Sequence, residues 1–239
     1  MPPAPMPDDW QRALVIAAHP DDIEYGIAAA VAAWTGAGKE VHYLLATRGE
    51  AGMFGVRPEE AASIREDEER RSAAVVGVTE VEFLDHRDGV LEAGPTLRRD
   101  IAAAIRRHQP ELVVTGYFGP TWTPPGVSPG HLNSADHQAL GQSVLNAVAD
   151  AGNEWIFPDL TEPRWPGVKY IAVQDMADPA HEVDVADQVE KAVSSLAEHA
   201  RYLELLSDVS VREQAQQVID MSTMTENGRR RVGFRLYWG

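Results

Sequence analysis

Short apolar runs alternate with longer, partly charged segments along this chain, which indicates strands and helices in turn. The first run, residues 13–18, is apolar throughout, as is typical of a parallel strand that is buried on both faces. Further strands are predicted at residues 40–47, 81–84, 112–115, 169–174, 181–185 and 231–238. Helices are predicted at residues 22–37, 58–76, 97–108, 135–151, 187–206 and 211–221.

This order predicts an α/β fold with a Rossmann-like, doubly wound, mostly parallel sheet in a single domain. The chain has 239 residues, which is enough for one large α/β domain with a buried core. Proline-rich residues 1–12 are predicted to be an N-terminal arm, and residues 13–239 the domain itself. Two irregular segments, residues 116–134 and 153–167, are expected to shape a ligand pocket, because long loops in compact domains are commonly functional.

Chemically useful side chains follow the first strand, in the sequence AHPDD at residues 18–22. Ligands of α/β sheets bind at the carboxyl ends of strands, and His19 and the two aspartates are placed there. Imidazole and carboxylate are common zinc ligands. Adjacent residues of an extended backbone point in different directions, so one of Asp21 and Asp22 can hold a metal while the other acts on a water molecule. The plainer alternative is a turn followed by a helix N-cap.

A catalytic zinc site generally has three protein ligands and an open position, so a further ligand is needed. Asp136 and His137 follow the long loop after the strand at residues 112–115. In a doubly wound sheet that strand and the first are neighbours at the topological switch point. We therefore expect His19, Asp22 and His137 to lie together.

Composition and net charge exclude several classes of partner and of metal ligand. The net charge of −16 argues against non-specific binding to nucleic acid or to an anionic membrane surface. The absence of cysteine excludes disulfides, zinc thiolates and cysteine nucleophiles, so any metal must use histidine and carboxylate. No stretch has the length of a membrane span or the pattern of a secretory signal, and we expect a cytoplasmic protein. Whether copies of the chain form a homo-oligomer stays open.

Three motifs together resemble the LmbE-like family of zinc-dependent N-deacetylases, which includes the enzymes acting on N-acetylglucosaminyl-phosphatidylinositol (PIG-L). They are AHPDD at residues 18–22, TRGEAG at residues 47–52 and NSADH at residues 133–137. The resemblance implies that His19, Asp22 and His137 hold one zinc ion and that Asp21 is the general base. It also implies that the substrate is a small N-acyl amino sugar or a related conjugate, with acetyl as the acyl group.

The resemblance extends to substrate contacts. Arg65, which forms an Arg-x-x-Glu pattern with Glu68, and Asp88 are implied to contact substrate at the rim of the site. Glu50 is placed at the mouth, after the second strand. The rest of the charged run at residues 66–71 is expected to be a solvated helix face.

One departure from the family affects the general acid. Relatives commonly have His-Pro-Asp-His where this chain has Ser134 to His137, and the first histidine of that motif is the acid. A hydroxyl cannot replace imidazolium, so either His131 supplies the proton or Asp21 returns it. Asp136 completes the set of catalytic candidates with Asp21 and His131.

Two competing functions remain. The departure at Ser134 makes a non-catalytic metal- or sugar-binding domain plausible. A nucleotide-binding Rossmann domain is disfavoured, because no Gly-x-Gly-x-x-Gly turn follows the first strand. Among the other histidines, His42 is expected to be structural within its strand and His108 to be a surface residue at a helix C-terminus. The sequence does not decide whether His199 lies near the pocket or away from it.

Overall fold

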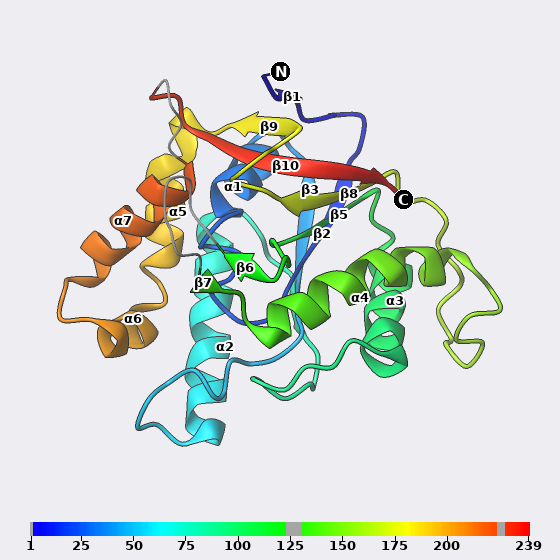
Figure 1. Ribbon diagram of the computed structural model, residues 1–239, viewed down its shortest axis with the longest axis horizontal. Coiled ribbons are helices and arrows are strands. Elements are labelled where there is room, and N and C mark those ends of the chain that lie inside the picture. The colour runs from blue at the N-terminus through cyan, green and yellow to red at the C-terminus, as the bar shows by residue number, and fades with distance from the viewer. Residues whose placement is uncertain (1, 123–130, 224–227) are drawn as a thin grey trace.

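The computed structural model describes residues 2–122, 131–223 and 228–239, and it confirms the predicted α/β fold (Figure 1). The strands are β1 (Ala4–Pro5), β2 (Arg12–Ala17), β3 (Glu40–Leu45), β4 (Val81–Phe83), β5 (Leu112–Thr115), β6 (Thr121–Trp122), β7 (His131–Leu132), β8 (Tyr170–Gln174), β9 (His181–Asp184) and β10 (Arg231–Trp238). The helices are α1 (Ala28–Gly36), α2 (Pro58–Val75), α3 (Pro95–His108), α4 (Ala135–Gly152), the 3-10 helix η1 (Ala186–Gln188), α5 (Val189–Leu196), α6 (Ala200–Leu206) and α7 (Val211–Thr223).

In the described residues, the main sheet has eight strands in the order β1-β9-β10-β8-β5-β2-β3-β4. Strand β2 pairs in parallel with β3 on one side and with β5 on the other. The chain leaves β2 toward α1 on one face and leaves β5 toward α4 on the opposite face. This divergence is the predicted switch point, and it opens a crevice at the carboxyl ends of β2 and β5.

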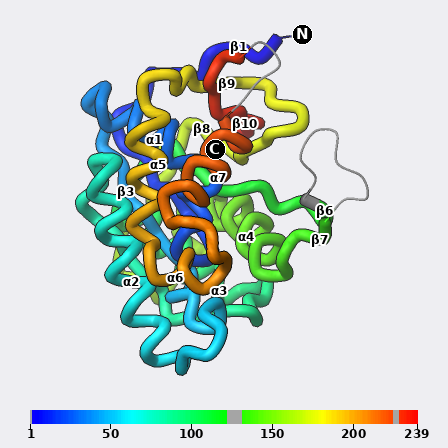
Figure 2. The backbone as a smooth tube through the Cα atoms, turned by 90° about the vertical axis from the view of Figure 1, so that its left-hand side faces the viewer, coloured from blue at the N-terminus to red at the C-terminus, as the bar shows by residue number. Residues whose placement is uncertain are grey.

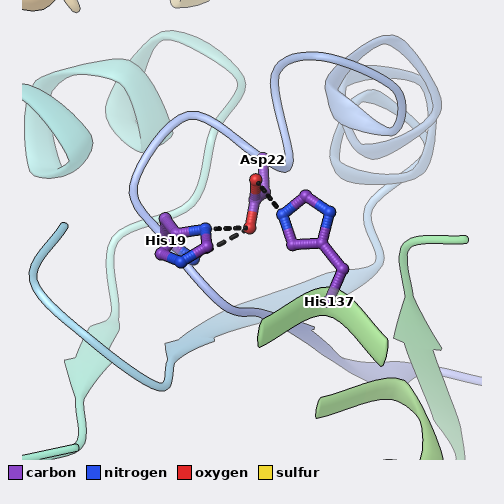
Figure 3. A group of neighbouring side chains, drawn as sticks. All are labelled: His19, Asp22 and His137. Atoms are coloured by element: carbon purple, nitrogen blue, oxygen red, sulfur yellow. Dashed lines mark hydrogen bonds and ion pairs between the residues drawn. The ribbon is translucent and has the colours of Figure 1, made fainter. Parts of the chain in front are cut away.

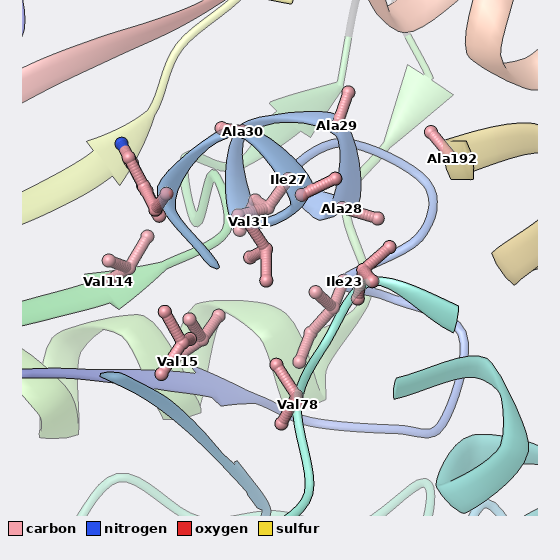
Figure 4. Close-up of a cluster of buried hydrophobic side chains, with 14 of the residues drawn as sticks. Val15, Ile23, Ile27, Ala28, Ala29, Ala30, Val31, Val78, Val114 and Ala192 are labelled. Atoms are coloured by element: carbon pink, nitrogen blue, oxygen red, sulfur yellow. The ribbon is translucent and has the colours of Figure 1, made fainter. Parts of the chain in front are cut away.

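Both faces of the sheet are covered by helices, which explains the uninterrupted apolar run of β2. Val15 points into a core that contains α1, α5 and α7, whereas the next residue, Ile16, points into a core with α3 and α4. Figure 4 shows Val15 and Val114 in the first of these cores, beside the small side chains of α1. Alternate residues of one strand therefore fill two different cores.

The edge of the sheet that lies opposite β4 contains strands from both ends of the chain, β1 and β10. Strand β10 runs antiparallel to β8 and β9, and β1 pairs in parallel with β9. Figure 2 shows β1, β9 and β10 together at one end of the molecule. Trp10 is buried and its ring lies 5.5 Å from that of Trp34 in an edge-on arrangement. Residues of the predicted arm thus pack onto the rest of the fold.

Two helix predictions were wrong in their extent. The first helix begins at Ala28, and residues 22–27, which we expected to be helical, form turns. The helix predicted over residues 187–206 is divided into η1, α5 and α6, and the break between α5 and α6 at residues 197–199 includes the buried His199. In the loop predicted at residues 116–134, β6 and β7 pair in antiparallel fashion, and residues 123–130 lie outside the described residues. No helix in the described ranges is long and apolar enough to span a membrane.

Candidate active site

Three potential metal ligands, His19, Asp22 and His137, converge at the carboxyl ends of β2 and β5 (Figure 3). Asp22 lies between the two rings: its Oδ2 is 3.3 Å from His19 Nδ1, and its Oδ1 is 3.0 Å from His137 Nε2. The first two residues belong to the turn after β2, and His137 belongs to the first turn of α4. The switch point therefore unites residues that are 115 positions apart.

The orientation of His137 is fixed by Asn133. The Asn133 amide nitrogen donates to the carbonyls of Tyr117 and Gly119, so its Oδ1 faces the ring and accepts from His137 Nδ1 at 2.9 Å. This hydrogen bond places the proton on Nδ1 and leaves the lone pair of Nε2 directed at Asp22.

The orientation of His19 is fixed by two carboxylates. His19 Nε2 lies 3.1 Å from both Asp88 Oδ1 and Asp136 Oδ2, so this nitrogen carries the proton and Nδ1 faces Asp22. Asp136 is buried and also accepts from the backbone N–H groups of Gly89 and Leu91. Asp136 therefore lies behind the ring, where it is placed to orient His19.

The donor set fits a divalent metal. Two imidazole lone pairs and one carboxylate face one another, and each ring is held through its other nitrogen, as is usual for metal-binding histidines. Although burial lowers the pKa of His19, the charge of Asp22 and hydrogen bonds to the carboxylates of Asp22, Asp88 and Asp136 raise it to about 12. Burial also lowers the pKa of His137, but Asp22 raises it overall. The surroundings of both rings therefore stabilise positive charge.

Asp21 lies next to this cluster in a different environment. Its side chain is 9% exposed, and its Oδ1 accepts from Arg65 Nη2 at 2.8 Å. Burial raises the pKa of Asp21, and the charge of Arg65 opposes that rise. The backbone of Asp21 has a φ of 91°, in the left-handed region, and its N–H donates to Glu69 Oε2 at 3.1 Å. A strained backbone thus directs the Asp21 and Asp22 carboxylates to different partners.

The TRGEAG motif encloses Arg65. Arg65 is 2% exposed, donates to the carbonyls of Pro20 and Gly49, and lies with its guanidinium 3.9 Å from the centre of the Tyr202 ring. A Cβ at Gly52 would come within 2.4 Å of Arg65 Nη1, and Gly49 has a φ of 64°. The glycines of the motif therefore leave room for the buried arginine.

Asp88 and Glu50 hold two loops together. Glu50 Oε1 accepts from the N–H of Asp88, and Asp88 Oδ2 accepts from the N–H of Ala51, both at 2.8 Å. We expected Arg65 and Asp88 to line the rim of the site. Both line the cavity, but they lie deeper than its rim, because Arg65 contacts Asp21 and Asp88 contacts His19.

A cavity of about 510 Å³ opens in front of the cluster. His19, Asp21, Asp22 and His137 line it, and its other walls include Tyr25, Thr115, Tyr117, Gln174, Met176 and Tyr202. Residues 116–117 and 131–134 also contribute, as expected for the long loop. The expectation for residues 153–167 was wrong in the described residues, because Phe157, Leu160 and Trp165 pack instead against the core on the α3–α4 face.

Ser134 and His131 have different positions at the cavity. Ser134 is the N-cap of α4, and its Oγ accepts from the N–H of His137 at 3.0 Å. His131 begins β7, is exposed and lines the cavity. The hydroxyl at the departure from the family pattern therefore helps to fix the helix that carries His137.

Sequence reasoning did not identify several residues around the site. The motif NSADH does not by itself mark Asn133 as a partner of His137, and no sequence pattern places Tyr202 in the cavity wall. Glu69 was assigned to a solvated helix face, yet it is buried and supports Asp21. His199 is buried with its Nε2 3.5 Å from Glu24 and 3.6 Å from Glu69, behind Asp21. The available signal was spacing: Arg65, Glu69 and Ser72 recur on one face of α2 at helical intervals.

Fold and site together define an α/β protein with a candidate metal centre at the switch point of its sheet and a buried carboxylate beside that centre. The family model described as PIG-L, GlcNAc-PI de-N-acetylase, matches residues 14–148. The chain belongs to this family of N-deacetylases, and the resemblance drawn from the three motifs is confirmed. The non-catalytic alternative is not favoured.

Individual proteins show the same relationship. The chain is 27% identical over 199 residues to a probable N-acetyl-alpha-D-glucosaminyl L-malate deacetylase 2 of Bacillus anthracis, covering 80% of each chain. It is 30% identical over 196 residues to the diacetylchitobiose deacetylase of Thermococcus kodakarensis, covering 80% of this chain and 70% of that protein. The solved N,N'-diacetylchitobiose deacetylase of Pyrococcus horikoshii shares the fold, with a TM-score of 0.78 at 24% identity over 96% of this chain and 84% of that one.

Proposed function

We propose that this protein uses one zinc ion to hydrolyse the amide bond between an acetyl group and the nitrogen of an amino sugar or amino-sugar conjugate. The observation that carries the proposal is the pair of adjacent aspartates with different partners. Asp22 faces two histidines, whereas Asp21 is held by Arg65 and opens onto the same cavity. One carboxylate is thus suited to ligation and the other to proton transfer.

The proposed roles follow from these partners. His19, Asp22 and His137 would hold the metal, which when bound supplies Lewis-acid polarisation of the acetyl carbonyl and of a water molecule. Asp21 accepts the proton from the attacking water, a role favoured by the raised pKa of its carboxyl. Arg65, Tyr202 and Glu69 orient Asp21, and Asn133 and Asp136 orient the two histidines.

The departing amine must gain a proton as the C–N bond breaks. We assign this proton to His131, because it is an imidazole at the cavity wall and Ser134 is engaged as a helix cap. The alternative is that Asp21 returns the proton it accepted. His131→Ala distinguishes the two routes, because only the first route requires this imidazole.

The size and lining of the cavity support a sugar-sized substrate. A volume of about 510 Å³ lies within the range of small-molecule sites, and tyrosine rings stand beside polar side chains along its walls. Two of the relatives are named for N-acetylglucosaminyl malate and for diacetylchitobiose. We therefore propose an N-acetylglucosamine-type substrate and assign Asp88, on the cavity wall, to its hydroxyl groups, with Glu50 holding the Asp88 loop.

The test is amine release from N-acetylglucosamine, diacetylchitobiose and N-acetylglucosaminyl conjugates. The protein is stripped with a chelator and then reloaded separately with zinc, cobalt, manganese or nickel. We expect no activity in the stripped protein and its recovery with zinc. Amine release by the stripped protein would overturn metal dependence, better recovery with another ion would overturn zinc, and hydrolysis of only non-sugar N-acetyl amines would overturn the substrate class.

A further inference from the structure

A second group of histidine and carboxylate side chains lies outside the cavity. It joins His42 of β3, His108 at the end of α3 and Glu80, which directly precedes β4. The two Nδ1 atoms are 2.9 Å apart, and His42 Nδ1 is 3.0 Å from Glu80 Oε2. Glu80 Oε1 is 3.9 Å from His108 Nδ1. The group is near the amino ends of β3 and β4, whereas the catalytic cluster follows the carboxyl ends of the strands.

The opposite nitrogen of each ring is held by a separate carboxylate. His42 Nε2 is 2.8 Å from Glu40 Oε1, and His108 Nε2 is 2.8 Å from Glu82 Oε2. Ionised carboxylates only accept hydrogen bonds, so each Nε2 carries the proton. Each Nδ1 of a neutral ring then presents a lone pair, and the two lone pairs face each other.

Three acceptors therefore surround one point: two imidazole nitrogens and one carboxylate of Glu80. A single proton can link only one pair of acceptors, whereas a divalent cation can bind all three. Two histidines and one carboxylate form a usual set for zinc and similar ions, and carboxylates on the outer nitrogens are the usual support for such ligands. This is the same arrangement of inner and outer partners that His19 shows in the catalytic cluster.

The surroundings suit a cation that enters from solvent. Glu40, Glu80 and Glu82 supply three carboxylates around the two rings. Among the described residues, the side-chain cation that contacts one of these carboxylates is Arg107, which pairs with Glu82. The Glu80 side chain is 58% exposed and that of His42 is 14% exposed, so one side of the group is open. The His108 side chain is 5% exposed and anchors the other side.

We propose that His42, His108 and Glu80 form a second divalent metal site, selective for zinc-like transition ions and independent of the catalytic site. An ion at this position ties together β3, the segment before β4 and the end of α3, which are distant in sequence. The site thus stabilises the sheet edge without taking part in hydrolysis. The sequence did not predict this second site, because it indicated a structural role for His42 and a surface position for His108.

Zinc stoichiometry tests the site directly. Chelator-stripped protein is dialysed against buffered zinc, and bound metal is measured by elemental analysis in wild type, His19→Ala, His108→Ala and the double variant. We expect two, one, one and no equivalents, respectively. His86→Ala is the matched control, because His86 is also a half-buried histidine paired with an acidic side chain, Asp100, and it should retain two equivalents.

A cobalt spectrum separates binding from folding defects. Cobalt added to His19→Ala should give the visible absorption of a nitrogen- and oxygen-ligated ion, and His108→Ala in that background should abolish it. The exposed substitution Glu80→Gln preserves the core and should weaken binding in the His19→Ala background by about tenfold or more. Deacetylation by His108→Ala should equal that of wild type. A single equivalent in wild type, or two in His108→Ala, would show that the histidine pair shares only a proton and would overturn the proposal.

Discussion

Replacing Arg65 tests how the proposed base is tuned. Arg65 Nη2 donates to Asp21 Oδ1 at 2.8 Å, and the side chains are 3% and 9% exposed. A hydrogen bond between charged groups contributes about 1.5–3 kcal/mol, which corresponds to about 1–2 pKa units at 1.36 kcal/mol per unit. Arg65 stabilises the ionised form of Asp21, so Arg65→Met should raise the pKa of Asp21 by that amount. Because only the carboxylate is a base, the acid limb of kcat/KM should move to higher pH by the same amount.

The assay is the pH profile of kcat/KM, which reports ionisations of the free enzyme. Arg65→Lys is the control, because it keeps the charge near Asp21 and should move the acid limb less. Thermal unfolding of both variants is measured first, since Arg65 also donates to the Gly49 carbonyl at 3.4 Å. An unchanged acid limb with a raised KM would show that Arg65 does not tune the pKa of Asp21. It would instead support the substrate-contact role that the family pattern implied for Arg65.

Three further predictions concern the start of α4 and the strand before it. Asn133→Ala should weaken metal affinity about 10–100-fold because His137 loses its orienting acceptor, and unchanged affinity in a competitive zinc titration would contradict this. His131→Ala should lower kcat about 10²–10⁴-fold with unchanged metal content, whereas near-normal kcat would mean that Asp21 returns the proton. Ser134→Ala should lower the free energy of unfolding by about 1 kcal/mol through loss of the N-cap, which urea denaturation would measure; no loss would contradict the capping role.

The sequence was most informative where strand pattern and chemistry coincide. The apolar run of β2 is followed at once by His19, and the parallel order places the end of β5 beside it. The approach of His19, Asp22 and His137 follows from that topology alone. The same local pattern misplaced the start of α1, because helix propensity takes no account of side-chain bonds to the backbone. Asp22 Oδ2 accepts from the N–H groups of Ala18 and His19, and this holds the turn open before the helix begins.

The burial of charged side chains was not predicted from the sequence. Charged residues occur around much of α2, so the helical spacing of Arg65 and Glu69 places them on one face but does not by itself distinguish that face from a solvated one. Their burial depends on distant partners, Asp21 for both, together with the space left by Gly52. Buried charge also accompanies the division of the helix predicted over residues 187–206. His199, which lies in the break, is placed between the buried carboxylates of Glu24 and Glu69. Such contacts join segments far apart in sequence, and a single sequence gives no measure of them.

In the proposed mechanism, Asp22 binds the metal and Asp21 transfers the proton. Metal content and amine release measured on the same preparations of wild type and Asp21→Asn test it most directly. We expect Asp21→Asn to retain the wild-type metal content, while its turnover of an N-acetylglucosamine conjugate falls about 10²–10⁴-fold. Loss of one metal equivalent from Asp21→Asn would mean that the two carboxylates have exchanged roles, and full turnover would show that Asp21 is not the base.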